Sequence, residues 1–273
     1  MIFTIAVQDT RIIDNNGSSI VLLHHKHAIE ELGHTVHFIN LNDEIPESDY
    51  IIVQSEWYKH RRWPDNLIVW IGHFQPNRKY RMPELSKIRA KAYFTQWTGE
   101  CVKFAESKVG KPIFYFPHAV CSCNTEGKVI SSPRTLFIGA NYKERSQDWL
   151  DYAGVPRIQC QHEVAKNYYK SALVSPNLHG AFQLNQKTEY MEIPGRMVND
   201  RAFNIIASGG FCVSDNEMMR DFIDIPIAET KEEYKRLIDY YVNNPEERLP
   251  IMEKAKKQLP TYKEYYKKLI ETL

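Results

Sequence analysis

Short apolar runs recur along the first half of the chain and alternate with helical patterns. Helical periodicity covers Ile20–Leu32 and the stretch around 99–109, and no tight hairpin signal joins the apolar runs. This alternation predicts an α/β fold with a doubly wound parallel sheet. The runs that predict its strands cover residues 2–7, 37–40, 48–53, 67–71, 92–95 and 112–116.

A polar stretch at 121–133, with Gly127 and Pro133, interrupts this pattern and predicts an interdomain linker. Beyond it the alternation restarts, so we expect a second sheet domain. The expected strands are 135–139, 173–179, 211–213 and an edge strand at 225–228, and the expected helices include residues 149–150, 163–172, 218–223, 231–242 and 245–273 with a break at Pro260. Residues 180–198 show neither period and predict a long loop. The expected domains are 1–130 and 131–258, followed by a last helix, 259–273, whose apolar stripe packs back on the first domain.

One stretch, Arg201–Asp215, joins a helix to a strand through a glycine turn. Phe203, Ile206 and Ala207 share one helical face, which predicts a buried helix. Gly209 and Gly210 follow and predict the helix end, because glycine accepts the left-handed conformation of a C-terminal cap. In parallel sheets, ligands bind beyond the carboxyl ends of the strands, so polar residues beside this turn are binding candidates.

Composition is that of a globular protein: 273 residues, 43% hydrophobic and 25% charged. No run of 18 apolar residues occurs, and the N-terminus predicts a strand and not a signal peptide. Five scattered cysteines then favour reduced thiols and a cytoplasmic location. Cys121 and Cys123 lie near His118 but lack a fourth ligand and a zinc-like spacing, so we expect no metal site.

Charge is unevenly distributed although the whole chain carries a formal net charge of only +1. Residues 59–91 contain nine Lys or Arg against Asp65 and Glu84, a local net charge of +7. This segment predicts an anionic partner, and its candidate contacts are Arg61, Arg62, Arg78 and Lys79. The alternative interpretation is an ordinary solvated surface, with the neighbouring tryptophans in the core.

Polar residues also follow the predicted strands of the first domain. Asp9 follows the first strand and His73 follows the strand 67–71, so both are candidates for acid–base chemistry. Gly17 and Ser18 precede the first helix, where free backbone N–H groups bind anions. A plain capped helix start, with Ser18 or Ser19 as N-cap, is the alternative.

The pattern Arg-x-Phe-x-x-x-Ala-x-Gly-Gly-Phe-x-x-Ser-Asp at 201–215 resembles the C-terminal signature of GT-B glycosyltransferases, closest to the spore-maturation type and related to group 1 transferases. Residues 32–36 and 115–120 also resemble phrases of that fold. The resemblance implies two Rossmann-like doubly wound parallel-sheet domains facing across a cleft. It also implies transfer of a sugar from a nucleotide-sugar co-substrate without a metal or other cofactor, and the chain has no Asp-x-Asp metal motif.

The resemblance also assigns a donor site to the second domain. It implies that Gly139, Lys143 and Arg145 hold the donor phosphates, and that Asn204 lies near the ribose, where relatives commonly have a glutamate. The same implied site includes His179, Arg201, Gly209 and Gly210.

Three functions remain open at this point. The first is a glycosyltransferase with a small or polymeric acceptor, and the second is one that glycosylates modified bases in DNA. The third is a non-catalytic, transferase-like protein that binds a nucleotide. Salt-sensitive DNA binding would favour the second function, and failure of every nucleotide sugar to stabilise the protein would favour the third.

Overall fold

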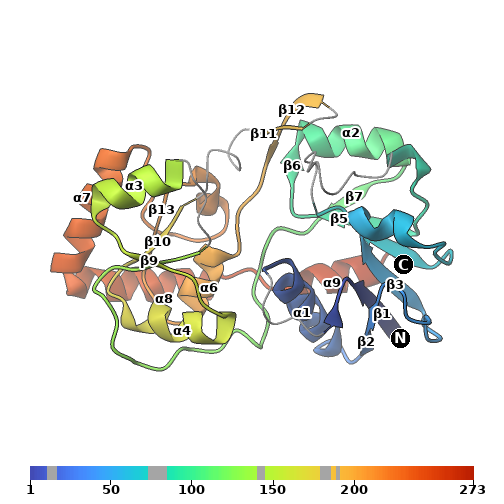
Figure 1. The fold of residues 1–273 in the computed structure, drawn as a ribbon, viewed down its shortest axis with the longest axis horizontal. Coiled ribbons are helices and arrows are strands. Elements are labelled where there is room, and N and C mark those ends of the chain that lie inside the picture. The colour runs from blue at the N-terminus through green and yellow to red at the C-terminus, as the bar shows by residue number, and fades with distance from the viewer. Residues whose placement is uncertain (11–16, 73–84, 140–144, 179–185, 189–190) are drawn as a thin grey trace. The chain divides into compact units, whose positions relative to one another are not determined.

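The computed structural model describes residues 1–10, 17–72, 85–139, 145–178, 186–188 and 191–273, with side chains omitted at 17–20, 85, 145–146, 186–188 and 191–196 (Figure 1). The chain forms two compact units. The N-terminal unit comprises Met1–Pro117, Asn185–Met197 and Thr261–Leu273, and the C-terminal unit comprises His118–Leu184 and Val198–Pro260.

A parallel six-stranded sheet forms the centre of the N-terminal unit, in the order β2-β1-β3-β4-β5-β7. The strands are β1 (Ile2–Val7), β2 (Thr35–Asn40), β3 (Tyr50–Gln54), β4 (Leu67–Trp70), β5 (Ala92–Thr95) and β7 (Ile113–Tyr115). The central strands are buried on both faces, which explains their continuous apolar runs. The strand order changes direction between β1 and β3, as in other doubly wound folds.

Among its described residues, this unit contains the α-helices α1 (Gly17–Glu30), α2 (Glu100–Val109) and α9 (Tyr262–Ile270). Because α1 begins at Gly17, Ser18 and Ser19 lie inside the helix, so the predicted serine N-cap is wrong. The unit also holds the 3₁₀ helices Ser55–His60 and Leu85–Lys87.

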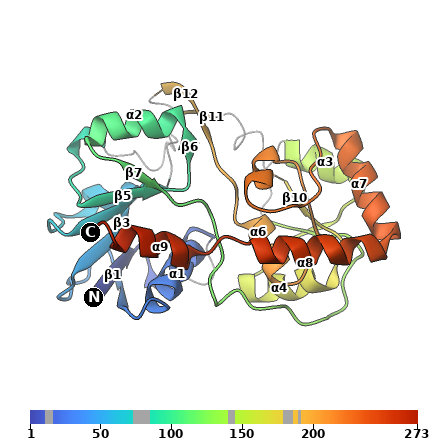
Figure 2. The ribbon, with the colours of Figure 1, turned by 180° about the vertical axis from the view of Figure 1, so that it is seen from behind.

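The last helix, α9, packs on α1 within the N-terminal unit, and both views show the two helices side by side (Figures 1 and 2). A buried hydrogen bond of 2.7 Å joins His25 Nδ1 to the Tyr266 hydroxyl. The His25 ring also contacts the rings of Tyr262, Trp70 and Phe94, at centroid distances of 4.6, 5.7 and 5.4 Å. The apolar stripe of α9 thus completes the core of the unit that begins the chain.

A second, antiparallel sheet of this unit lies where the sequence predicted only a loop. It has the order β11-β12-β6, formed by Gln186–Thr188, Met191–Arg196 and Thr98–Gly99. Pro194 and Gly195 suggested a loop, but both lie inside β12, where Gly195 pairs with Gly99 and with Gln186. The ladder is only a few pairs long, so its sequence carries little strand signal.

The C-terminal unit is built from shorter strands. They are β8 (Phe137–Ile138), β9 (Arg157–Ile158), β10 (Ser175–Asn177) and β13 (Cys212–Ser214), and all their pairings are parallel. Single parallel bridges, Thr135 to Val174 and Ser214 to Ile227, connect the pairs into the order β9-β8-β10-β13-Ile227. The predicted edge strand 225–228 is therefore one bridge, and the direction of the order changes between β8 and β10.

In the described ranges this unit contains the α-helices α3 (Arg145–Ala153), α4 (His162–Ser171), α6 (Arg201–Ala207), α7 (Lys231–Asn243) and α8 (Arg248–Gln258). The predicted helix at 218–223 is a 3₁₀ helix, Glu217–Asp221. The break at Pro260 between α8 and α9 agrees with the sequence expectation.

Candidate functional site

The carboxyl ends of β8 and β10 meet at the point where the strand order of the C-terminal unit reverses. We call this place the C-terminal switch point and define it by Gly139, Leu178 and Arg201. Gly139 follows β8 directly and Leu178 follows β10 directly. Ligands of open α/β sheets bind beyond such a reversal, because the neighbouring strand connections leave in opposite directions there.

Arg201 is the first residue of α6, and its guanidinium lies at this switch point. Nη1 donates a hydrogen bond of 3.2 Å to the Leu178 carbonyl, and the guanidinium carbon lies 4.5 Å from the centroid of the Phe137 ring. Within the described part of the chain, no carboxylate forms an ion pair with Arg201. A planar cation fixed by a carbonyl and a ring keeps its remaining N–H groups for an anionic ligand.

Gly139 lets the guanidinium lie against the backbone. A Cβ atom at this position would lie 2.9 Å from Arg201 Nη2 and 2.9 Å from the Phe137 ring. Gly139 is not among the glycines with positive φ, so the requirement for glycine here is steric and does not come from the backbone conformation. The sequence predicted both Gly139 and Arg201 as site residues, and the structure brings them into contact.

The glycine turn after α6 has a packing role. Gly209 has φ of +80°, the left-handed conformation expected for a C-terminal cap. At Gly210 a Cβ atom would clash with the Tyr169 carbonyl of α4. These two glycines thus allow α6 to pack closely on α4 while Phe203 and Ile206 enter the core.

Asn204 is buried on α6, with 6% of its surface exposed, and it already has protein partners. Its Nδ2 donates to Asp200 Oδ2 at 3.2 Å, and its Oδ1 accepts from Asn124 Nδ2 at 2.9 Å. Asn124 in turn accepts a hydrogen bond from the Cys121 backbone N–H. Asn204 therefore anchors the segment that follows His118 to the helix that carries Arg201.

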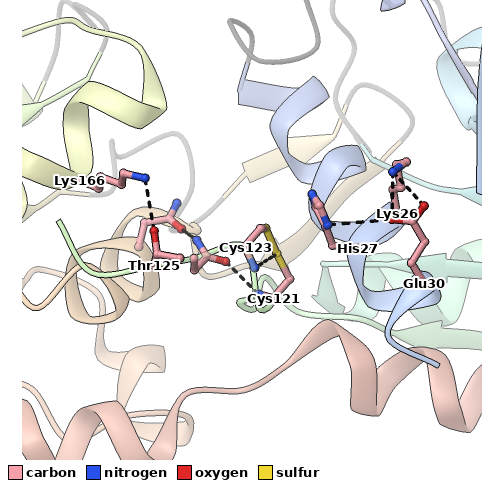
Figure 3. Close-up of a disulfide and its surroundings, with 9 residues drawn as sticks. Lys26, His27, Glu30, Cys121, Cys123, Thr125 and Lys166 are labelled. Atoms are coloured by element: carbon pink, nitrogen blue, oxygen red, sulfur yellow. Dashed lines mark hydrogen bonds and ion pairs between the residues drawn. A yellow bond between two sulfur atoms is a disulfide. The ribbon is translucent and has the colours of Figure 1, made fainter. Parts of the chain in front are cut away.

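Cys121 and Cys123 form a disulfide in this segment (Figure 3). The expectation of reduced thiols is therefore wrong for this pair, because a single intervening serine brings their sulfur atoms together. Among the remaining cysteines, Cys101 and Cys212 are buried free thiols, and burial raises the pKa of Cys101 to about 11. A neutral, buried thiol is a packing group and not a nucleophile.

The next strand ends of this unit hold polar residues that the sequence did not single out as site residues. Asn177 Nδ2 donates to Ser214 Oγ at 3.0 Å, and the Asn216 backbone N–H donates to the same hydroxyl at 3.2 Å. Asn177 and Ser214 are fully buried, so the network fixes the backbone at the ends of β10 and β13. The signal that could have identified them is that each is a polar residue at the carboxyl end of a short strand.

The N-terminal unit has its own reversal of strand order, at the carboxyl ends of β1 and β3. Asp9 follows β1 there and is partly exposed, and the neighbouring Thr10 backbone N–H donates to Asn40 Oδ1 at 2.9 Å. The Gly72 carbonyl after β4 accepts from the Trp97 indole at 2.9 Å and from the Gln96 side chain. Strand ends of this sheet are thus held by buried polar side chains.

Arg61 and Arg62 follow the 3₁₀ helix Ser55–His60. Arg61 Nη1 donates to the Asp43 carbonyl at 2.6 Å, and its guanidinium lies 5.7 Å from the Trp63 ring centroid, while Arg62 is exposed. Gly17 begins α1, as stated above. The remaining predicted site residues, His73, Arg78, Lys79, Lys143 and His179, and the side chains of Ser18 and Arg145, lie outside the described residues.

Both units thus have parallel strands whose order reverses once, the doubly wound architecture that the sequence pattern predicts. The glycosyl transferase-like family model matches residues 124–271, more than half of the chain, so the protein belongs to that family. The predicted fold class and the predicted enzyme class are therefore confirmed. No curated protein matches the chain by sequence.

Solved structures with the same fold span the whole chain. The DNA-modifying enzyme β-glucosyltransferase, solved with and without uridine diphosphoglucose, has a TM-score of 0.62 at 10% identity and covers 100% of this chain and 99% of its own. An α-glucosyltransferase in complex with UDP-glucose and DNA containing an abasic site has a TM-score of 0.68 at 11% identity, covering 99% and 98%. A glycosyltransferase involved in avilamycin A biosynthesis has a TM-score of 0.60 at 10% identity, covering 99% and 96%.

None of the helices in the described ranges is long and apolar enough to cross a membrane.

Proposed function

We propose that this glycosyltransferase takes its sugar from a nucleotide-diphosphate sugar bound at the C-terminal switch point. The observation that carries the proposal is Arg201, a guanidinium fixed against Gly139 without a carboxylate partner in the described residues. A diphosphate leaving group gains charge as the glycosidic bond breaks. Preorganised guanidinium N–H donors stabilise that charge, and bonds to charged groups are stronger than neutral ones.

Lys143 and Arg145 are proposed as further phosphate ligands, since both follow Gly139 closely in the sequence and Arg145 is the first residue of α3. Asn204 is proposed to lie near the ribose. It uses one amide hydrogen and one acceptor position within the protein, which leaves one of each for a hydroxyl group. Its anchoring of Asn124 gives it a second, structural task.

We also propose that the reaction needs no metal, because cationic side chains supply the charge that a metal would otherwise offset. A structure of T4 phage BGT holds UDP and Mn²⁺, so the proposal needs a direct test. Activity should be the same after treatment with EDTA and after addition of Mn²⁺. A loss of activity in EDTA that Mn²⁺ restores would contradict metal independence.

Calorimetry with UDP, UDP-glucose and other nucleotide sugars tests the donor site. We expect Arg201→Gln to weaken binding by about 1.5–3 kcal/mol, roughly 10- to 150-fold, because a charge-assisted bond is lost. Arg236→Gln is the matched control, since this arginine is 72% exposed on α7 of the same unit. Equal affinities of wild type and Arg201→Gln would remove Arg201 from the donor site.

DNA containing modified bases is a second candidate acceptor. Arg61 and Arg62 place cations after β3 of the N-terminal unit, and a full-length structural neighbour was solved with UDP-glucose and DNA. Because the avilamycin enzyme has the same fold, the acceptor has to be decided by experiment. Glucose transfer to duplex DNA containing hydroxymethylated pyrimidines should exceed transfer to unmodified DNA, and its absence with every nucleotide sugar would exclude this acceptor.

A further inference from the structure

A cavity of about 720 Å³ lies within the N-terminal unit, where β5 and β7 begin and α2 ends. It is therefore at the amino edge of the sheet, whereas the strand ends that hold Asp9 and Gly72 are at the carboxyl edge. Its lining is rich in cations: it contains Arg89, Lys91, Lys108 and Lys111 against the Asp65 side chain and the main-chain carboxylate of Leu273, a net charge of +2.

The two cations that make hydrogen bonds are held by backbone carbonyls. Lys111 Nζ donates to the carbonyls of Ala90 and Lys91 at 2.9 and 3.2 Å, and Arg89 Nη1 donates to those of Ser86 and Ile88 at 2.6 and 3.2 Å. Within the described residues, none of the four cations forms an ion pair. The third hydrogen of Lys111 and the Nη2 and Nε groups of Arg89 are then donors in fixed positions.

The sheet register places the backbones of two of these cationic residues side by side. Tyr93 of β5 pairs with Ile113 of β7, and Lys91 and Lys111 each stand two residues earlier. Neighbouring strands are about 4.8 Å apart, so the two residues begin adjacent strands at the same level. The Lys91 ammonium lies 5.8 Å from the Tyr50 ring centroid, whereas Lys111 Nζ is held by the Ala90 and Lys91 carbonyls, so the two cations offer separate donors at this edge of the sheet.

A hydrogen bond links the lining of the cavity to the 3₁₀ helix that precedes the cations proposed above for the acceptor. The Arg89 backbone N–H donates to the Tyr58 hydroxyl at 2.9 Å, and Tyr58 belongs to the 3₁₀ helix that leads into Arg61 and Arg62. The helix that precedes Arg61 and Arg62 is thus bonded to the lining of the cavity, so these two cations and the four of the cavity belong to connected parts of the unit. Such a series exceeds what one small anion requires and fits a polymer that carries a phosphate at every nucleotide.

We propose that this cavity binds backbone phosphates of a nucleic-acid acceptor, away from the reacting base. The proposal rests on the second candidate function, DNA as the acceptor. Phosphate contacts fix the position of a duplex without reading its sequence, so binding here is independent of base modification. Its role is to hold the polymer while another part of the enzyme acts on one base.

The test compares two variants of the full chain that each remove two positive charges. Lys91→Gln/Lys108→Gln changes the cavity, and neither lysine makes a hydrogen bond or ion pair in the described part of the chain. Lys103→Gln/Lys263→Gln is the matched control, with exposed lysines of α2 and α9 that do not line the cavity. Binding of an unmodified 20-base-pair duplex is measured by fluorescence anisotropy between about 50 and 200 mM salt.

Each lost phosphate contact should lower the slope of log K against log salt by about 0.9, so the cavity variant should lose about two units and the control variant none. Equal slopes for the two variants, or no DNA binding by wild type at the lowest salt, would overturn the proposal. If the cavity variant loses binding of inorganic pyrophosphate while its DNA slope is unchanged, the site takes small anions and the nucleic-acid proposal also fails. UDP binding by the same variants reports on the donor site separately, so failure of the proposed function is distinguishable.

Discussion

Replacing Gly139 by alanine tests whether the backbone at the C-terminal switch point positions Arg201. The added Cβ atom would lie 2.9 Å from Arg201 Nη2, 2.9 Å from Phe137 Cε1 and 3.2 Å from Phe137 Cζ. Both neighbours are constrained, since Phe137 is 3% exposed and Arg201 Nη1 is bonded to the Leu178 carbonyl. The guanidinium therefore has to move, and its hydrogen bond or its contact with the ring is lost.

Two magnitudes follow from this geometry. Overpacking of a buried position typically costs about 1–3 kcal/mol of unfolding free energy. Displacing the guanidinium should weaken nucleotide-sugar binding by about 1.5–3 kcal/mol, the value of one hydrogen bond to a charged group. Urea unfolding measures the first and calorimetry with UDP-glucose measures the second.

A control and a double-mutant cycle separate the site effect from general destabilisation. In the control Gly154→Ala, the added Cβ atom has no neighbour within 4 Å, but the residue keeps the left-handed φ of +66°. This variant should lower the unfolding free energy by about 1–2 kcal/mol and leave nucleotide affinity unchanged. In an Arg201→Gln background, Gly139→Ala should cost much less affinity than in wild type, because the group it displaces is gone. If Gly139→Ala weakens binding equally in both backgrounds, or not at all, the positioning role of Gly139 is refuted.

Three further predictions concern other parts of the molecule. Tyr266→Phe should lower the unfolding free energy by about 1–3 kcal/mol in urea titrations, because His25 Nδ1 loses its buried partner; an unchanged midpoint would show that this bond is not stabilising. Asp9→Asn should reduce kcat without changing the Kd for UDP if Asp9 is the acceptor-side base, and an unaltered kcat would exclude that role. Reduction of the Cys121–Cys123 disulfide should cost at most about 1.5 kcal/mol, since it closes a very short loop, and thiol labelling with and without reductant would show whether the bond is present.

The sequence predicted the N-terminal sheet well because its central strands are buried on both faces and are continuously apolar. Its strand boundaries differ from the predicted ones by only a few residues at each end. The strands of the C-terminal unit are two or three residues long, so their apolar runs include residues that pack in the core without pairing. The hairpin β11-β12 was missed because Pro194 and Gly195 carry a loop signal that pairing overrides.

The candidate site was only partly visible in the sequence. Gly139 and Arg201 were identified separately by resemblance, but nothing in the sequence shows that a Cβ atom at one would clash with the other. Asn204 occupies a position where relatives commonly have a glutamate, and its hydrogen bonds to Asp200 and Asn124 give a physical reason for the amide. A carboxylate accepts but cannot donate, so a glutamate here would lose the bond to Asp200 and place two negative charges together.

The role of the Asn204 amide can be tested with the substitution Asn204→Asp. The aspartate still accepts the hydrogen bond from Asn124 Nδ2. The amide nitrogen that donates to Asp200 Oδ2 at 3.2 Å is replaced by a carboxylate oxygen, so two carboxylates face each other there. Repulsion between the two carboxylates should raise the pKa of one of them and lower stability above that pKa, so the loss should shrink as pH falls toward 4. Urea unfolding of wild type and variant between pH 4 and 8 measures this dependence. If the variant is equally destabilised at every pH, charge repulsion is not the cause, and the role assigned to the Asn204 amide is wrong.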